Sequence, residues 1–364
     1  MKTVAVVGAR PQFIKAAVVS RALSERCPDV HEVLVHTGQH YDANMSDVFF
    51  DELEIPRPDY NLGIGGGTHG QNTGRMIAGI EEVLLKETPD WVLVYGDTDS
   101  TLAGALAAVK LHLPIAHVEA GLRSFDRRMP EEVNRVLTDH VSDLLCTPTD
   151  AATRNLANEG IAGPQVVQTG DVMYDAARYY AAKAAAQSTV LERLQLTPGN
   201  YVLTTVHRAA NTDDPERLRR ILEGLARSPL VVVWPLHPRA RQQLVSHGLR
   251  IPPSVMAIEP VGYLDMTMLE ANACLIATDS GGVQKEAYFH RVPCLTLRSE
   301  TEWVELVSTG WNVLVPSLVA DLGQEVSRAR IKPAEHPELF GTGDAGGHVV
   351  RLLKACHPTA PRSR

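Results

Sequence analysis

Residues 274–287 read CLIATDSGGVQKEA, an apolar run followed by a polar turn with two glycines and then a helical pattern. A run that is apolar on both faces and leads into a helix is typical of a buried strand in a parallel sheet. The same order of strand, turn and helix recurs along the chain, beginning with VAVVG at residues 4–8. We therefore expect an α/β fold in which helices cover parallel sheets.

The apolar runs form two successive groups, which suits a chain of 364 residues because that length is large for one hydrophobic core. We expect one domain at residues 1–171 together with a last helix at 347–364, and a second domain at 172–346. The Ala-rich stretch 171–200 is expected to be helical and to connect them. The predicted strands are Val4–Gly8, Glu32–Thr37, Trp91–Gly96, Ile115–Glu119, Leu144–Pro148 and Val166–Gly170 in the first group, and Tyr201–Val206, Leu230–Pro235, Val255–Ile258, Cys274–Thr278, Pro293–Leu297 and Asn312–Val315 in the second.

Composition excludes several classes of protein. Apolar residues make up 44% of the chain, which is ordinary for a globular protein, and a net charge of −8 argues against a general nucleic-acid binder. The five cysteines are scattered without a CxxC pair, so we expect buried thiols in a reducing compartment. No apolar stretch is long enough to span a membrane, and the first strand is too short for a signal peptide. We expect a cytoplasmic protein.

The turn after the strand at 274–278 is a candidate phosphate site. Ser280, Gly281 and Gly282 would place a hydroxyl and free backbone N–H groups at the start of a helix, where anions are favoured. Glu286, about one and a half turns into that helix, could accept hydrogen bonds from ribose hydroxyls. The alternative is an ordinary helix cap formed by Asp279 or Ser280.

A second candidate anion site opens the chain at GARPQFIK, residues 8–15. Gly8 allows a sharp turn after the first strand, and Pro11 suits the first turn of a helix. Arg10 and Lys15 would then bring two positive charges toward the carboxyl end of the sheet, where parallel α/β sheets bind ligands. Because the two anion sites fall in different domains, we expect a ligand held in the cleft between the domains.

Carboxylates also follow strands of the first domain. Asp97, Glu119 and Glu131 lie in YGDTDS, HVEAGLRS and MPEEVNR, respectively, and their neighbours Asp99 and Glu132 are expected to cap helices. Buried carboxylates are costly unless they are paired or functional, and a cluster of them suits proton transfer near neutral pH.

Two histidines follow strands of the second domain. His207 lies in TVHR and His237 in PLHPR, and either could face a bound diphosphate or be a structural residue. His36 and His40 are separated by three residues around Gly38, but no further ligand cluster accompanies them, so a metal site is not expected.

Taken together and in this order, these segments resemble the non-hydrolysing UDP-N-acetylglucosamine 2-epimerase family. The resemblance implies the GT-B fold, in which two Rossmann-like domains with parallel sheets face a deep cleft and the last helix crosses back to the first domain. The matching segments, which span nearly the whole chain, are GARPQFIK (8–15), TGQH (37–40), YGDTDS (95–100), HVEAGLRS (117–124), MPEEVNR (129–135), TVHR (205–208), PLHPR (235–239), TDSGGVQKEA (278–287) and TEWVE (301–305).

The resemblance implies an isomerase that interconverts UDP-GlcNAc and UDP-ManNAc for polysaccharide biosynthesis. UDP would be eliminated together with the C2 proton to give a 2-acetamidoglucal, and would then add back with the opposite configuration at C2. We expect a homodimer, a UDP-sugar partner, no cofactor and no metal. The implied catalytic residues are Asp97, Glu119, Glu131 and His207, and the implied substrate-binding residues are Arg10, Lys15, Arg135, Arg208, His237, Ser280, Gly281, Gly282 and Glu286.

Departures from the family pattern leave alternatives open. Ala210 stands where the family usually has a Glu, which would fit a nucleotide-sugar-binding regulator without catalytic activity. Residues 41–45 also differ from the family pattern, in a segment that helps to form a regulatory site in bacterial members. The TEWVE segment is closer to a subgroup that acts on UDP-2,3-diacetamido-2,3-dideoxyglucuronic acid. Arg123, Arg127 and Arg128 could bind the added carboxylate of that sugar. A hydrolysing epimerase or a GT-B glycosyltransferase is a further alternative.

Overall fold

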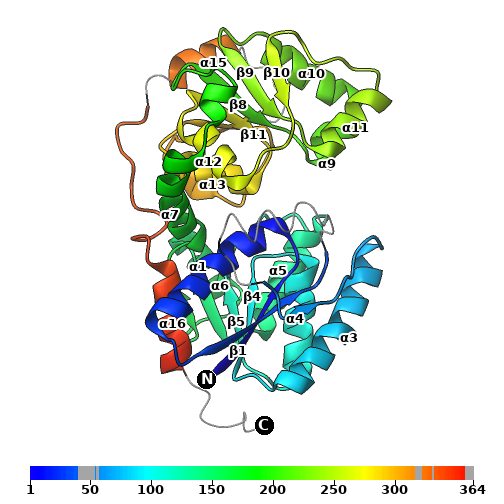
Figure 1. Ribbon diagram of the computed structural model, residues 1–364, viewed down its shortest axis with the longest axis vertical. Coiled ribbons are helices and arrows are strands. Elements are labelled where there is room, and N and C mark those ends of the chain that lie inside the picture. Colours follow the sequence, from blue (N-terminus) through cyan, green and yellow to red (C-terminus); the bar gives the residue numbers. More distant parts are fainter. Residues whose placement is uncertain (40–53, 55–56, 316–321, 330–331, 357–364) are drawn as a thin grey trace. The chain divides into compact units, whose positions relative to one another are not determined.

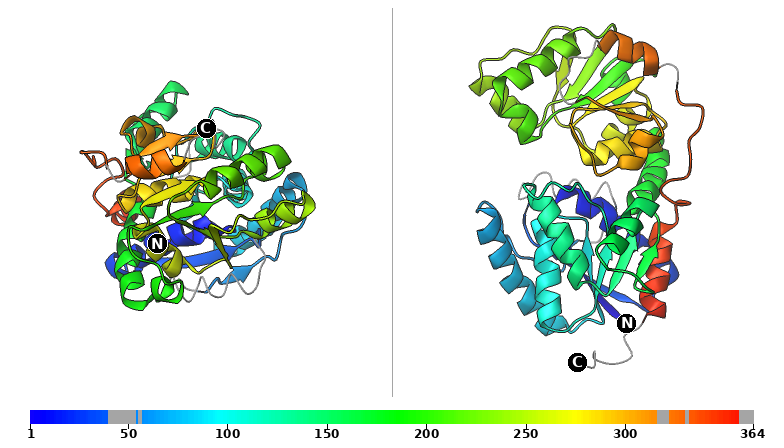
Figure 2. Two further views of the ribbon diagram at one scale, coloured as in Figure 1. Left: turned by 90° about the horizontal axis from the view of Figure 1, so that it is seen from above. Right: turned by 180° about the vertical axis from the view of Figure 1, so that it is seen from behind.

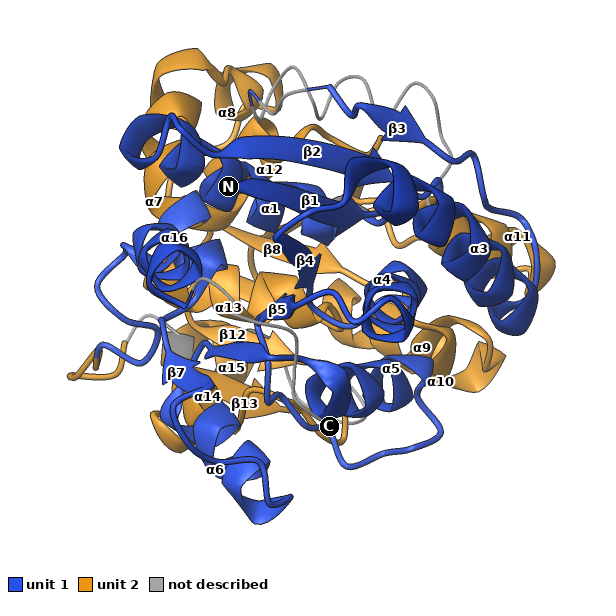
Figure 3. Ribbon diagram, turned by 90° about the horizontal axis from the view of Figure 1, so that it is seen from below, with its two compact units in different colours: residues 1–176, 338–364 blue, residues 177–337 orange. Residues whose placement is uncertain are grey.

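The computed structural model describes residues 1–39, 54, 57–315, 322–329 and 332–356. The chain divides into two compact units, unit 1 at residues 1–176 with 338–364 and unit 2 at residues 177–337, which Figure 3 shows in different colours. None of the described helices is long and apolar enough to cross a membrane.

Unit 1 contains a seven-stranded sheet with the order β3-β2-β1-β4-β5-β6-β7, and its paired strands are all parallel. Helices α3, α4 and α5 lie along one face of this sheet, and α1 and α16 lie along the other (Figures 1 and 3). Its strands are β1 (Lys2–Val7), β2 (His31–His36), β3 (Tyr60–Asn61), β4 (Trp91–Tyr95), β5 (Ile115–Val118), β6 (Leu144–Thr147) and β7 (Val166–Gln168), and its helices include α1 (Arg10–Arg26), α3 (His69–Glu87), α4 (Asp99–Lys110), α5 (Pro130–Val141), α6 (Asp150–Asn158) and α16 (Ala345–Ala355).

Alternation along the strands explains why both faces of this sheet are apolar. Val4 and Val6 of β1 pack with the buried side chains of α3 and α4, whereas the intervening Ala5 points to the opposite face. Close packing there requires a glycine in α16, because a Cβ atom on Gly346 would lie 2.7 Å from the Cγ1 atom of Val18 in α1. The last helix of the chain is therefore an integral part of unit 1.

Unit 2 repeats the design with a six-stranded sheet in the order β10-β9-β8-β11-β12-β13, again with parallel pairs. Val202 and Trp234 pack with α10 and α11 on one face, whereas Leu203 and Ile276 pack with α12 and α13 on the other. The ribbon of this unit can be followed from two further directions in Figure 2. The strands are β8 (Tyr201–Thr205), β9 (Val231–Pro235), β10 (Val255–Ile258), β11 (Leu275–Thr278), β12 (Cys294–Thr296) and β13 (Asn312–Leu314), and the helices are α8 (Val190–Arg193), α9 (Ala209–Thr212), α10 (Pro215–Ala226), α11 (Pro238–Ser246), α12 (Tyr263–Ala271), α13 (Gly281–Phe289), α14 (Val304–Ser308) and α15 (Leu322–Ala329).

The α/β fold predicted from the sequence is confirmed, and all twelve predicted strands are present. The short edge strand β3 was not predicted, because two residues carry no periodic pattern. The stretch 171–200, which was predicted to be helical, contains two helices, α7 (Val172–Gln187) and α8. The expectation that every cysteine is buried is wrong for Cys356, which is exposed just after the last helix.

Candidate active site

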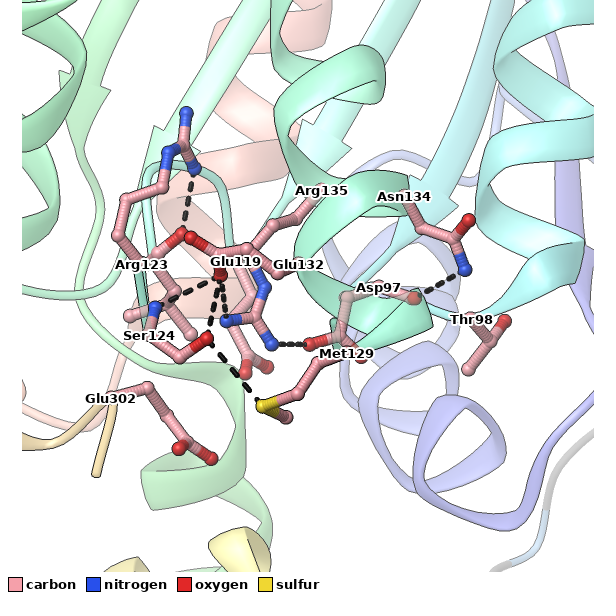
Figure 4. Close-up of polar contacts among 12 residues, drawn as sticks. Asp97, Thr98, Glu119, Arg123, Ser124, Met129, Glu132, Asn134, Arg135 and Glu302 are labelled. Atoms are coloured by element: carbon pink, nitrogen blue, oxygen red, sulfur yellow. Dashed lines mark hydrogen bonds and ion pairs between the residues drawn. The ribbon is translucent and has the colours of Figure 1, made fainter. Parts of the chain in front are cut away.

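Asp97 is the second residue after β4, and its carboxylate pairs with the guanidinium of Arg135 from α5 (Figure 4). The backbone carbonyl of Asp97 also accepts a hydrogen bond of 3.0 Å from the side chain of Asn134. Burial alone would raise the pKa of Asp97, but the positive charges of Arg135 and Lys15 hold this pKa below its usual range. Asp97 is therefore an ionised, firmly placed carboxylate whose side chain is still 30% exposed.

Glu119 lies directly after β5 and forms a buried ion pair with Lys15 of α1. Its backbone has a φ of 74°, in the left-handed region that is unfavourable for a side chain of this size. The N–H groups of Glu119 and Ala120 both bond to the carbonyl of Cys146 in the neighbouring strand, which holds this conformation. A strained backbone of this kind persists only where the surrounding structure stabilises it, and it is often found at functional sites.

Glu131 and Glu132 share the first turn of α5 but differ in their surroundings. Glu131 is exposed, whereas Glu132 is buried and accepts hydrogen bonds from the backbone N–H groups of Ser124 and Phe125. Glu132 also pairs with Arg135 at 2.9 Å, so that Arg135 joins Glu132 to Asp97 (Figure 4). Glu132 thus holds the loop before α5 as well as the arginine that holds Asp97.

The segment GARPQ forms the turn between β1 and α1. The side chain of Gln12 accepts hydrogen bonds from the N–H groups of Gly8 and Ala9, and donates to the carbonyl of Tyr95 at the end of β4. This glutamine was not singled out from the sequence, yet it fixes the turn relative to the strand that leads to Asp97. Arg10 is the first residue of α1, and its side chain lies outside the described part of the structure.

In unit 2, Ser280 is the N-cap of α13, and its hydroxyl accepts from the N–H of Val283 at 3.4 Å. Gly281 and Gly282 form the first turn, where helix N–H groups lack partners within the helix. A Cβ atom on Gly281 would lie 2.4 Å from the Oε1 atom of Glu302, so a side chain could be placed there only if Glu302 moved. The absence of a side chain at Gly281 therefore allows the Glu302 carboxyl group to lie close to this helix terminus, where anions are favoured.

Glu286 follows in the second turn of α13, where it is buried and accepts a hydrogen bond of 3.3 Å from the hydroxyl of Tyr263 in α12. Burial, together with the Glu286 and Glu270 carboxylates, raises the pKa of Tyr263 well above its usual value, so Tyr263 stays a neutral donor. The carboxylate of Glu286 is therefore held in place beside the terminus formed by Ser280 and the two glycines.

Within unit 2, the two histidines predicted from the sequence, His207 and His237, lie near the start of α13. The Nδ1 atom of His207, after β8, is 3.1 Å from the Oδ1 atom of the fully buried Asp279, and its ring lies 5.3 Å from that of His237. His237 caps α11 by accepting from the N–H of Arg239. The backbone N–H of Arg208 donates to Asp279. The predicted residues of unit 2 thus gather at the carboxyl ends of β8, β9 and β11.

Some residues considered from the sequence have other partners in the structure. Arg123 is buried between Asp139 and Glu159, with both pairs at 2.7 Å, so its charge is already neutralised. Asp99 does not cap α4, since the cap is Thr98, and instead pairs with His69 and accepts a hydrogen bond from Asn134. His40 and residues 41–45 lie outside the described residues.

Comparison with known proteins identifies the family. The model of the UDP-N-acetylglucosamine 2-epimerase family matches residues 21–354. A UDP-2,3-diacetamido-2,3-dideoxy-D-glucuronate 2-epimerase from Pseudomonas aeruginosa is 52% identical, and a UDP-N-acetylglucosamine 2-epimerase from Methanocaldococcus jannaschii is 45% identical; each alignment covers 97% of this chain and 99% of the relative. A crystal structure of the M. jannaschii enzyme in complex with UDP-GlcNAc and UDP has a TM-score of 0.90, with 44% identity over 98% of this chain and 100% of that one. The predicted resemblance and the GT-B type of architecture are therefore confirmed, and the chain belongs to the UDP-N-acetylglucosamine 2-epimerase family.

Proposed function

We propose that the chain is a UDP-sugar 2-epimerase that interconverts UDP-GlcNAc and UDP-ManNAc without releasing free sugar. The membership of the family supports an isomerase, and two of the similar solved structures contain UDP-GlcNAc. The observation in this chain that carries the proposal is the pair of ordered carboxylates, Asp97 and Glu119, each fixed by a cation at the end of a strand. Removal of a proton from one face of a carbon and return of a proton to the other face suit two such groups, one on each side.

We assign the elimination of UDP and its re-addition to two carboxyl groups of unit 1. A carboxylate of unit 1 takes the C2 proton while the bond between C1 and the UDP oxygen breaks, which gives a C1=C2 double bond and UDP. A second carboxyl group, protonated before this step, gives its proton to the other face of C2 as UDP adds back to C1, and both groups then regain their starting protonation by exchange with solvent. Asp97, Glu119 and the exposed Glu131 are the candidates, with Lys15 and Arg135 holding the first two.

The residues of unit 2 would bind the UDP. The N–H groups and hydroxyl at Ser280, Gly281 and Gly282 suit a diphosphate, and Glu286 suits the ribose hydroxyls. His207, with Arg208 and His237 nearby, would supply a proton or a positive charge as the diphosphate departs. Arg10 would add a further charge. A homodimer and a place in polysaccharide biosynthesis remain parts of this proposal.

One observation favours a second sugar. The relative that is 52% identical carries the name UDP-2,3-diacetamido-2,3-dideoxy-D-glucuronate 2-epimerase, and the TEWVE segment of this chain fits that subgroup. Arg123 is an unsuitable ligand for the sugar carboxylate, because Asp139 and Glu159 already neutralise it. Arg128, which is exposed and pairs with Asp126, would have to exchange that partner.

Proton NMR on the two substrates in heavy water tests the proposal. We expect deuterium at C2 and formation of the 2-epimer with one of them, without accumulation of UDP. Stoichiometric release of UDP and free sugar would instead identify a hydrolysing enzyme. Binding of both nucleotide-sugars without exchange of the C2 proton would identify a nucleotide-sugar-binding regulator.

A further inference from the structure

His117 is buried between the strands that lead to Asp97 and Glu119. It lies in β5, two residues before Glu119, and its side chain has no exposed surface. Its Nε2 atom is 2.7 Å from the backbone carbonyl oxygen of Gly96, the residue that precedes Asp97. One ring therefore bonds the peptide that leads to Asp97 to the strand that leads to Glu119.

The partners of the ring determine its protonation. A backbone carbonyl can only accept, so the Nε2 atom must carry a proton to bond to Gly96. The Nδ1 atom lies 2.7 Å from the Oδ1 atom of Asp139 in α5. If that carboxyl group is ionised, it too can only accept, and both ring nitrogens carry protons.

Two donors other than His117 favour the ionised form of Asp139. Its Oδ2 atom accepts from the Nη1 atom of Arg123 at 2.7 Å and from the N–H of Gly121 at 3.2 Å. The permanent charge of Arg123, 2.7 Å from this carboxylate, favours its ionised form independently of His117. With Glu159 on the far side of Arg123, the network has two carboxylates and one guanidinium. A positive charge on His117 makes it neutral, which buried charges require.

The Gly96 peptide is held from both sides. Its N–H donates to the carbonyl of Val118 at 3.0 Å, and its carbonyl accepts from His117, so both of its polar groups bond to β5. Gly96 has a φ of 64°, which a glycine adopts readily, and a Cβ atom there would lie 2.8 Å from the Nζ atom of Lys15. The direction in which the chain leaves β4, and with it the place of Asp97, depends on these bonds.

We propose that His117 is a doubly protonated positioning residue, which holds the Gly96 peptide and thereby places the Asp97 carboxylate for proton transfer at C2. Its positive charge also acts together with Arg135 and Lys15 to keep Asp97 ionised. This role depends on the proposed function, whereas the protonation of the ring does not.

The protonation is measured on the wild-type protein by NMR with ¹⁵N-labelled histidine at about pH 7. We expect both ring nitrogens of His117 to show a directly bonded proton that exchanges slowly with solvent, because the ring is fully buried. The spectrum of His117→Gln provides the assignment, or that of Asp139→Asn if the first variant does not fold. A ring nitrogen without a proton at this pH would overturn the inference.

The positioning role is measured by the kinetics of His117→Gln, with His140→Gln as the matched control because His140 is an exposed histidine of α5. In His117→Gln we expect kcat for C2 exchange to fall on the order of 100-fold, as small displacements of reacting groups do, while KM changes by about twofold or less. A folded His117→Gln protein with a wild-type kcat would contradict the role. If the wild-type protein itself shows no C2 exchange, the proposed function fails, and the NMR result still decides the protonation.

Discussion

The Nδ1 atom of His207 lies 3.1 Å from the Oδ1 atom of Asp279, and the Asp279 carboxylate also accepts from the backbone N–H groups of His207 and Arg208. Burial would raise the pKa of Asp279, but the hydrogen bond and charge of His207 hold it below its usual range. The carboxylate thus holds a proton on Nδ1 and leaves Nε2 available, which is the arrangement of an oriented acid–base histidine.

Asp279→Asn should therefore reduce kcat by about 100-fold, the range in which general acid–base catalysis operates, because Asn no longer fixes the charge and tautomer of His207. Steady-state kinetics of epimerisation and calorimetry of UDP binding measure the effect. Asp213→Asn, which removes an exposed carboxylate of the same unit, should behave as the wild type. An unchanged kcat in Asp279→Asn would show that His207 takes no part in proton transfer.

Glu131 and Glu132 offer a matched pair that separates chemistry from structure. Glu131→Gln should lower C2 exchange with little change in the free energy of unfolding, because Glu131 is exposed. Glu132→Gln should lower the free energy of unfolding by about 3 kcal/mol, because it disrupts a buried ion pair and hydrogen bonds to Ser124 and Phe125. Urea unfolding and the exchange assay give both quantities. Full activity of Glu131→Gln would remove Glu131 from the set of catalytic residues.

The helix terminus at Ser280 can be tested with two substitutions. Ser280→Ala removes the N-cap acceptor and should cost about 1 kcal/mol of stability, whereas Ser280→Asp keeps an acceptor there and should cost less. The order reverses for UDP, because a carboxylate at an anion site repels a diphosphate. Calorimetry should therefore show weaker UDP binding for Ser280→Asp than for Ser280→Ala. Equal affinities of the two variants would mean that no phosphate binds at this terminus.

Stability should depend on pH through Glu32 in β2. Burial, together with the nearby Asp59 carboxylate, raises the pKa of Glu32 to about 7. This folded-state pKa lies above the ordinary Glu value of 4.5, so the folded state binds the proton more tightly than the unfolded state. The protein therefore loses stability as the pH rises from 4.5 to about 7. Glu32→Gln should then be more stable than the wild type by about 1–3 kcal/mol at pH 8, and by much less at pH 4.5. Thermal unfolding of both proteins, with the exposed Glu25→Gln as control, checks this; equal Tm values at pH 8 would refute it.

Much of the fold could be predicted from the sequence, because buried parallel strands have an unmistakable pattern. The runs at 4–7 and 274–277 are apolar at every position, since helices cover both faces of their sheets. Strand β3 could not be predicted in this way, because it has two residues at the edge of a sheet. The exposure of Cys356 depends on where α16 ends, and helix ends are the least certain part of such a prediction.

The site could be predicted less completely. Asp97, Glu119 and Ser280 were found because each follows an apolar run, where parallel sheets place their ligands. Gln12, His117 and Asp139 were missed, because nothing in the local sequence shows that a side chain bonds to a distant peptide. The burial of Arg123 was missed for the same reason, because its partner Glu159 lies 36 residues away along the chain.

Deuterium incorporation at C2 tests the central claim most directly. The wild-type protein would be incubated in heavy water with UDP-GlcNAc and, separately, with UDP-2,3-diacetamido-2,3-dideoxyglucuronic acid, and followed by proton NMR, with Asp97→Asn and Glu119→Gln as variants. We predict that the C2 proton of one sugar is replaced by deuterium as the 2-epimer forms, and that both variants lose this exchange by at least about 100-fold while they still bind UDP. Wild-type exchange in either variant, or no exchange with either sugar in the wild-type protein, would contradict the account.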